Sequence, residues 1–293
     1  MESVATLSRV AISRVLLATD FSTEAQSALA WALLLSKRYG SRLFLTYAVP
    51  PDAGTRGVEI QVPLHEMMQS NAERQVALLE QTPELRSLPH EVIMRSGEPW
   101  QVLSQVASEE NVDLIVMGTH GRRGFSTLFL GSTAEAAIRH ARCPVLTVGP
   151  HVQPMSSDRL AHILYATDFS EGSLHALNYA LALAEEDRSE LTMLHIIESS
   201  PASKAELVQW IHDDRERLGE LIPPDFDLAH KPDIEVEVGA PAEEIVRMAA
   251  SRNVSLIVMG ARPDGAVVTH LPWTTLHHVL QQASCPVLTV RGQ

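Results

Sequence analysis

Cysteine, basic residues and long apolar runs are all scarce in this chain. Only two cysteines, Cys143 and Cys285, occur among its 293 residues, so a disulfide framework is excluded and a reducing compartment, the cytoplasm, is expected. Both thiols fit best as small buried hydrophobic groups. No apolar run approaches the roughly 20 residues that a membrane span needs, and the first nine residues are polar and mixed, unlike a secretory signal.

Acidic residues outnumber basic ones, 36 to 23, which gives a net charge of −13. A protein that binds DNA or RNA neutralises phosphates with Lys and Arg, so this balance disfavours a nucleic-acid partner. A small anion is still compatible with the chain, because local backbone N–H donors override the overall sign of the charge. The 45% hydrophobic and 20% charged composition is typical of a soluble globular protein.

An internal duplication organises the chain. The segment 111–118 recurs 142 residues later as 253–260, and the segment 143–148 recurs without a change as 285–290. We therefore predict two domains, 11–149 and 159–291, each close to the usual domain size. The residues between them have the composition of a linker.

Strand and helix signals alternate in each copy. Apolar runs too short for a helix are interpreted as buried strands, and amphipathic segments as the helices between them. Ser22 or Thr23 is expected to cap the first helix, and Gly40 to end it. This alternation predicts an α/β fold with a parallel five-stranded sheet in each copy and helices on both faces. The predicted strands are 14–20, 43–49, 90–95, 114–118, 144–148, 163–167, 190–197, 234–238, 256–260 and 286–290, and the predicted helices are 23–39, 64–81, 99–109, 132–140, 173–186, 202–221, 241–251 and 274–282.

A glycine-punctuated loop is the most informative feature of the first copy. It reads Gly118-Thr-His-Gly121, then nine residues, then Gly131-Ser132-Thr133, between a buried strand and an amphipathic segment. Glycines accept positive φ and let backbone N–H groups approach an anion, and a helix begins with unpaired N–H donors. The loop is neither a Walker A motif nor the dinucleotide Gly-x-Gly-x-x-Gly. It predicts a phosphate-binding turn.

The second copy has lost this loop without any insertion or deletion. Pro263 replaces Gly121, and Trp273 replaces Gly131. A proline offers no N–H, and an indole ring would occupy the place of a phosphate. Of the loop glycines, only the counterpart of Gly118, Gly260, remains.

Asp20 is a second candidate, because it follows the first strand. In doubly wound sheets, ligands bind beyond the carboxyl ends of the strands, where the strand order reverses. If strands one and four are neighbours, Asp20 faces the loop that begins at Gly118. Two roles are open for its carboxylate: a hydrogen bond to a sugar hydroxyl or an adenine edge, or the cap of the following turn. Its counterpart Asp168 is retained in the copy without the loop, which favours a mixed role.

The chain resembles a tandem universal stress protein. The resemblance rests on residues 16–22, the glycine loop and residues 143–148, and it extends over both copies. It implies an adenine nucleotide alpha hydrolase-like fold of doubly wound sheets with strand order 3-2-1-4-5, and ATP binding, with or without Mg²⁺, where the signature is kept. It also implies pairing of the two domains through their last strands, and it leaves a homodimer open.

The resemblance further implies which residues of the first domain contact ATP, and the degenerate loop implies that the second domain binds none. Ala18 and Asp20 would line the adenosine end, and Ala48, after the second strand, would touch adenine. The second domain, with its degenerate loop, is predicted to bind no ATP and to act in packing. The residues implied to contact the ribose and phosphates are Gly118, Gly121, Gly131, Ser132 and Thr133.

Other polar residues give weaker signals. Within the loop, His120, Arg122 and Arg123 would contact phosphates, a partner or solvent. His277 and His278 suggest a metal, but adjacent helical residues point about 100° apart and make a poor ligand pair, so no metal site is predicted.

Three functions fit the sequence. The first is a regulatory, ATP-binding stress protein with one nucleotide in the first domain. The second is a slow ATPase or phosphotransferase, although no clear general base and no acidic pair for Mg²⁺ accompany the loop. The third is a scaffold without nucleotide, in which the glycine loop is only a tight turn. Retention of the whole signature in one copy disfavours the third.

Overall fold

The structure, a computed structural model, describes residues 11–49, 64–119, 130–153, 159–198, 203–224, 226–261 and 271–292. The chain divides into two compact units, a first unit Ile12–Pro150 and a second unit His151–Gln293. Gly121 of the predicted site, together with His120, Arg122 and Arg123, lies outside the described residues.

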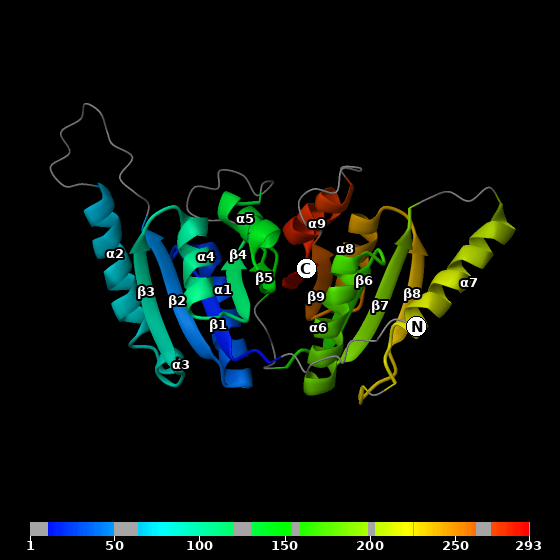
Figure 1. Ribbon diagram of the computed structural model, residues 1–293, viewed down its shortest axis with the longest axis horizontal. Helices are drawn as coiled ribbons and strands as arrows, with labels where there is room; N and C mark the ends of the chain where they lie inside the picture. Colours follow the sequence, from blue (N-terminus) through cyan, green and yellow to red (C-terminus); the bar gives the residue numbers. More distant parts are fainter. Residues whose placement is uncertain are drawn as a thin grey trace, which may run out of the picture. The chain divides into compact units, whose positions relative to one another are not determined.

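The first unit is a doubly wound α/β sheet (Figure 1). Its strands lie in the order β3-β2-β1-β4-β5, and every pair is parallel, as predicted. The chain runs outward along the sheet from β1 to β3 and then returns past β1 to β4 and β5. Because each crossover is right-handed, the helices of these two directions cover opposite faces of the sheet. The strands are β1 (Arg14–Ala18), β2 (Arg42–Val49), β3 (His90–Ser96), β4 (Leu114–Gly118) and β5 (Val145–Val148), and the helices are α1 (Thr23–Tyr39), α2 (Leu64–Leu79), α3 (Pro83–Arg86), α4 (Pro99–Glu109) and α5 (Ser132–His140).

The second unit repeats this topology. Its sheet has the order β8-β7-β6-β9-β10, again all parallel, which is 3-2-1-4-5 within the unit. The prediction of two such sheets is therefore confirmed. The strands are β6 (His162–Thr167), β7 (Glu190–Ile197), β8 (Asp233–Val238), β9 (Leu256–Ala261) and β10 (Val287–Arg291), and the helices are α6 (Glu171–Asp187), α7 (Lys204–Glu220), α8 (Pro241–Ser251) and α9 (Leu271–Gln282).

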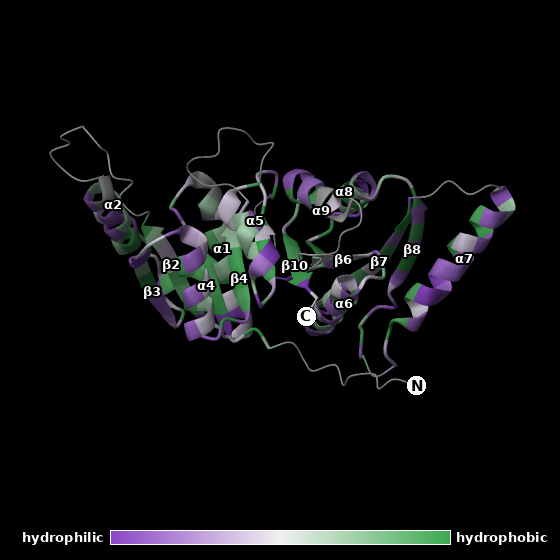
Figure 2. Cartoon of the chain, turned by 45° about the horizontal axis from the view of Figure 1, so that its top comes forward, coloured by the Kyte–Doolittle hydropathy of each residue, from purple (hydrophilic) through white to green (hydrophobic). Residues whose placement is uncertain are grey.

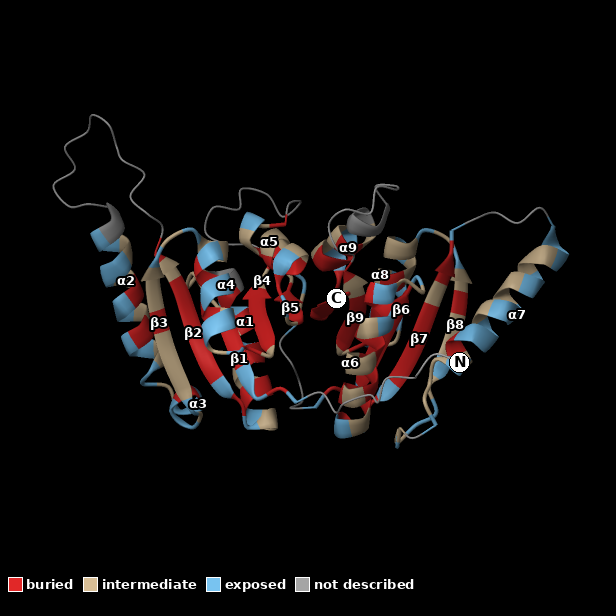
Figure 3. Cartoon of the chain, in the orientation of Figure 1, coloured by how far each residue is buried: buried red, intermediate tan, exposed pale blue. Residues whose placement is uncertain are grey.

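The central strands form the core of each unit. Val15, Leu16 and Leu17 of β1 are fully buried, and so are Ile163 and Leu164 of β6. Continuous apolar runs are expected where helices cover both faces of a parallel sheet. Figures 2 and 3 show the result: hydrophobic, buried strands beneath helices whose outer surfaces are polar and exposed.

Local sequence explains where α1 begins and ends. The Oγ of Ser22 accepts a hydrogen bond from the backbone N–H of Ala25 at 3.2 Å, and Gly40 adopts the left-handed conformation with φ of 64°. Both capping predictions are correct. Pro144 explains why β5 starts at Val145: the proline has no N–H for the ladder, but its carbonyl accepts from Ile115 N at 3.0 Å.

Most predicted helix ends agree with the structure to within two residues, and the two largest differences concern α3 and α9. The short helix α3 was not predicted, because its four residues are too few to show a period. Helix α9 begins at Leu271, three residues before the predicted start at 274. Pro272 is the second residue of this helix, a position where its missing N–H is not needed.

Candidate functional site

The predicted site residues that the structure describes lie at the carboxyl edge of the first unit's sheet. Ala18 is the last residue of β1 and pairs in register with Met117 of β4 and Thr46 of β2. Gly118, the last residue of β4, pairs with Val148 of β5. Strands one and four are thus neighbours, as the sequence argument required, and the turn after β1 lies at the same edge as the start of the glycine loop.

The two ends of the glycine loop are fixed to each other and to the sheet. Thr119, 2% exposed, donates its N–H to the carbonyl of Val148 at 3.1 Å, and its own carbonyl accepts from the N–H of Gly131 at 2.8 Å. Leu130 is also buried. These bonds bring the start of α5 directly beside the end of β4.

The first turn of α5 has backbone donors without a side-chain cap. Gly131 is the N-cap residue and has no side chain that could accept a hydrogen bond from this turn, whereas Ser22 caps α1 through its hydroxyl. The next residue, Ser132, is exposed, and Thr133 after it is half-buried. Their N–H groups carry the positive end of the helix dipole, so an anion is the partner that this helix start favours.

The backbone of the glycines departs from one expectation. Positive φ occurs, among the described glycines, at Gly40, Gly97 and Gly239, but not at Gly118, which is held in extended conformation by its pairing in β4. Gly131 has φ of −62° and ψ of 142°, which any residue adopts. Neither glycine is therefore required for its backbone angles.

A packing reason for the first glycine is visible in the second unit. A Cβ built on Gly260, the counterpart of Gly118, would lie 2.3 Å from the backbone nitrogen of Ser173 at the start of α6. One on Gly172 would lie 2.8 Å from the carbonyl oxygen of Ala261. The end of β9 and the start of α6 thus approach so closely that glycine is needed there without any ligand.

Asp20 caps a turn, as one of its two predicted roles requires. Its Oδ1 accepts hydrogen bonds from Ser22 N at 3.0 Å and Ser22 Oγ at 2.6 Å, and Phe21 between them has φ of 59°. Asp168 makes the same pair of bonds to Ser170, at 3.0 and 2.5 Å. The capping role is therefore common to both copies, and any role toward a ligand is additional to it.

Ala48 lies within β2 and not after it, which corrects its predicted position. It is half-buried and pairs with Arg95 of β3, two residues beyond Thr46. It still belongs to the carboxyl end of the strand, beside the end of β1.

The second unit does not repeat the helix start of the first. Because α9 begins at Leu271, the counterparts of Ser132 and Thr133, Thr274 and Thr275, are the fourth and fifth residues of this helix. Beyond the first four residues of a helix, backbone N–H groups donate to carbonyls of the same helix. The N–H groups at these two positions are therefore poorly placed to bind a ligand.

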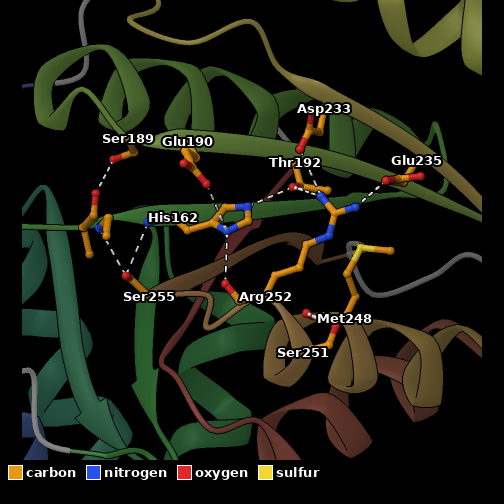
Figure 4. A network of polar contacts seen from close by, with 12 residues as sticks. His162, Ser189, Glu190, Thr192, Asp233, Glu235, Met248, Ser251, Arg252 and Ser255 are labelled. Carbon is orange, nitrogen blue, oxygen red and sulfur yellow. Dashed lines mark hydrogen bonds and ion pairs between the residues drawn. The ribbon is translucent and has the colours of Figure 1, made fainter.

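A polar network lies at the opposite, amino end of the second sheet (Figure 4). His162, 7% exposed at the start of β6, has its Nε2 2.8 Å from Oγ1 of Thr192. Arg252 donates from Nη1 to the same hydroxyl and to Asp233, both at 3.1 Å, and from Nη2 to Glu235. No sequence motif connects these residues, so sequence reasoning missed them. They join three strands and α8, far along the strands from the carboxyl edge, and we assign them a stabilising role.

Both cysteines are structural. Cys143 is half-buried and Cys285 is buried, and burial raises the pKa of each thiol to about 12. A redox role requires the opposite shift, toward a thiolate at neutral pH.

This pKa predicts slow alkylation in the folded chain. At about pH 8, iodoacetamide should modify Cys143 and Cys285 at least about 100-fold more slowly than in urea, because the thiolate is the reactive form and it is suppressed by burial. Mass spectrometry of timed samples measures both rates. Modification of the native chain at the denatured rate would contradict the structural assignment.

The described residues contain no group of three or more His, Cys, Asp or Glu side chains arranged to hold a metal ion. Within the same part of the chain, none of the helices has the length and apolar character needed to cross a bilayer.

Comparison with known proteins decides the family. The sequence model of the universal stress protein family matches residues 11–149 and again residues 160–291. The chain belongs to the universal stress protein family. The two matches account for most of its length, one in each half.

Individual relatives support this assignment. A universal stress protein from Thermus aquaticus is 33% identical over 135 residues, which is 46% of this chain and 96% of the relative. The YxiE universal stress protein of Bacillus subtilis is 29% identical over 144 residues, 44% of this chain and 97% of the relative. The crystal structure of a universal stress protein from Archaeoglobus fulgidus DSM 4304 covers 98% of both chains with a TM-score of 0.74 and 23% identity, so it supports the fold.

Proposed function

We propose that this universal stress protein binds one ATP per chain, in the first unit, and that nucleotide occupancy regulates its role in stress tolerance. One observation carries the proposal: the first turn of α5, whose N-cap residue Gly131 supplies no capping side chain, begins directly beside the end of β4, at the point where the strand order reverses. A phosphate chain is the ligand whose charge and acceptor oxygens suit such a turn.

The residues divide between the two ends of the nucleotide. Backbone N–H groups of Ser132 and Thr133 would donate to phosphate oxygens, and Gly131 leaves room for them. Ala18 and Ala48, small residues at the ends of β1 and β2, would admit the adenosine. Asp20, already fixed by Ser22, would accept a hydrogen bond from a ribose hydroxyl.

The second unit supports the stoichiometry. Its helix start is displaced to Leu271, Pro263 has no N–H, and Trp273 replaces the glycine of the N-cap. A proline has no N–H to donate, an indole is much bulkier than the hydrogen of a glycine, and a displaced helix start moves the unpaired N–H groups away from positions 274 and 275. A single site per chain follows.

The proposal is tested on the purified full chain. We expect denaturation to release ATP or ADP, identified by chromatography, or calorimetry of nucleotide-free protein to detect ATP binding with a favourable enthalpy from charge-assisted hydrogen bonds. Inorganic sulfate at the same ionic strength serves as the control for non-specific anion binding. Absence of released nucleotide together with no calorimetric signal for added ATP would refute the proposal.

A further inference from the structure

A chain of hydroxyl groups joins strand β6 to the first turn of helix α6 in the second unit. Thr167, the last residue of β6, accepts a hydrogen bond from the backbone N–H of Phe169 and donates to the Oγ of Ser173, both at 2.9 Å. Ser173 in turn donates to the backbone carbonyl of Ser170, the N-cap residue of α6, at 2.8 Å. Thr167 and Ser173 are 6% and 2% exposed. Buried hydrogen bonds in such a chain polarise and strengthen one another, so the turn between β6 and α6 is firmly held.

Tyr165 adds a second link between the same two elements. Its side chain is fully buried, and its hydroxyl donates to the backbone carbonyl oxygen of Ser173 at 2.8 Å. A phenol in a core needs such a partner, because an unpaired hydroxyl there is costly. We call Tyr165, Thr167 and Ser173 together the hydroxyl clasp of the second unit.

The backbone of the corresponding turn is the same in the first unit. The N–H of Phe21 donates to the hydroxyl of Thr19, and the N–H of Ser22 donates to the carboxylate of Asp20, both at 3.0 Å. The N–H of Ala25 donates to the Oγ of Ser22 at 3.2 Å. The equivalent three bonds of the second unit measure 2.9, 3.0 and 3.4 Å. The backbone amides of the two turns thus have matching acceptors, and a difference in their protection reports on other contacts.

The clasp cannot form in the first unit. Leu17 and Ala25 stand at the positions of Tyr165 and Ser173, and neither residue has a hydroxyl. The hydrogen-bond chain of the second unit therefore has no continuation into the first turn of α1. Asp20, the proposed partner of a ribose hydroxyl, belongs to this turn. The copy that keeps the nucleotide-binding signature is thus the copy without the clasp.

We infer that the hydroxyl clasp orders in the second unit the turn that the nucleotide orders in the first. The clasped turn, residues 167–173, is ordered without any ligand. The turn at residues 19–25 has fewer internal bonds and opens more often, and a ligand that bonds to it suppresses the opening. Nucleotide occupancy then changes the dynamics of the first unit alone. The role of the nucleotide rests on the proposed ATP site, whereas the difference between the two turns does not.

Hydrogen exchange of the nucleotide-free full chain, resolved by residue with NMR, compares the two turns directly. Each turn is referred to the central strand of its own unit, β1 or β6, so that a difference in overall stability cancels. The amides of Phe21, Ser22 and Ala25 should exchange at least about tenfold faster than their counterparts at 169, 170 and 173, because each additional hydrogen bond shifts the opening equilibrium about fivefold. Equal protection of the two turns would overturn the inference.

Two conservative substitutions remove the clasp from the second unit. Tyr165→Phe deletes one hydroxyl, and Ser173→Ala copies Ala25 of the first unit. In the double variant, protection of residues 169–173 should fall about tenfold, while protection of residues 21–25 stays constant as the internal control. Unchanged protection of the second turn in the folded double variant would also reject the clasp.

Addition of saturating ATP, with calorimetry on the same preparation, tests the link to the nucleotide. Protection of residues 21–25 should rise at least about tenfold, whereas protection of residues 169–173 stays constant. If calorimetry detects binding and the first turn does not respond, this inference is overturned and the proposed function stands. If no ATP binds, the proposed function and the role of the nucleotide in this inference both fail, and the nucleotide-free comparison still decides whether the clasp orders the second turn.

Discussion

Substitution of Gly131→Trp should abolish the proposed ATP binding in the first unit and leave its fold intact. The indole ring would occupy the space in front of the first turn of α5, where Ser132 and Thr133 offer their N–H groups. Two charge-assisted hydrogen bonds at about 1.5 kcal/mol each amount to about 3 kcal/mol, or at least a 100-fold loss of affinity. The fold tolerates the change because Gly131 has φ of −62°, an ordinary value for any residue.

Calorimetry with ATP measures this loss, and circular dichroism checks the fold. The matched control is Trp273→Gly, which makes the reverse change in the second unit. It should leave ATP binding as in the wild-type chain, because Pro263 and the early start of α9 at Leu271 remain. If Gly131→Trp still binds ATP with wild-type affinity, the phosphates are not at α5.

Substitution of Gly260→Ala destabilises the second unit by about 3 kcal/mol or more. The added methyl group would lie 2.3 Å from Ser173 N and 2.5 Å from the carbonyl carbon of Gly172. Both atoms belong to the backbone of α6, which cannot rotate away as a side chain would, so the helix or β9 must shift.

Urea unfolding of the full chain, followed by hydrogen exchange to assign each transition to a unit, measures this effect. Gly219→Ala is the control, because a Cβ there meets only Ile234 Cδ1 at 3.5 Å and alanine is a better helix former than glycine in the last turn of α7. It should be neutral or stabilising. An unchanged urea midpoint of the second unit in Gly260→Ala would show that β9 and the start of α6 are less closely packed than described.

Much of the fold follows from short-range sequence signals. Apolar runs such as 114–118 specify buried strands, Ser22 and Gly40 specify the ends of α1, and alternation with helices specifies a parallel sheet. The prediction that Asp20 lies near the glycine loop follows from the doubly wound topology, in which strands one and four are neighbours. Alternating strands and helices favour this topology. These features depend on contacts close in sequence or on the chirality of crossovers.

Other features depend on contacts that a single sequence does not display. The retained glycine at position 260 is explained by the approach of α6, an element some 90 residues earlier in the chain. Tyr165 and Ser173 form a hydrogen bond only because the first turn of α6 lies against β6. The start of α9 at Leu271 was missed, although Pro272 is a residue type that is favoured in the first turn of a helix.

The central claim is one nucleotide per chain, and native mass spectrometry counts it directly. With excess ATP, the wild-type chain should gain the mass of one ATP, Gly131→Trp none, and Trp273→Gly one. Two molecules bound to the wild-type chain, or one that remains in Gly131→Trp, would contradict an account in which only the first unit holds ATP.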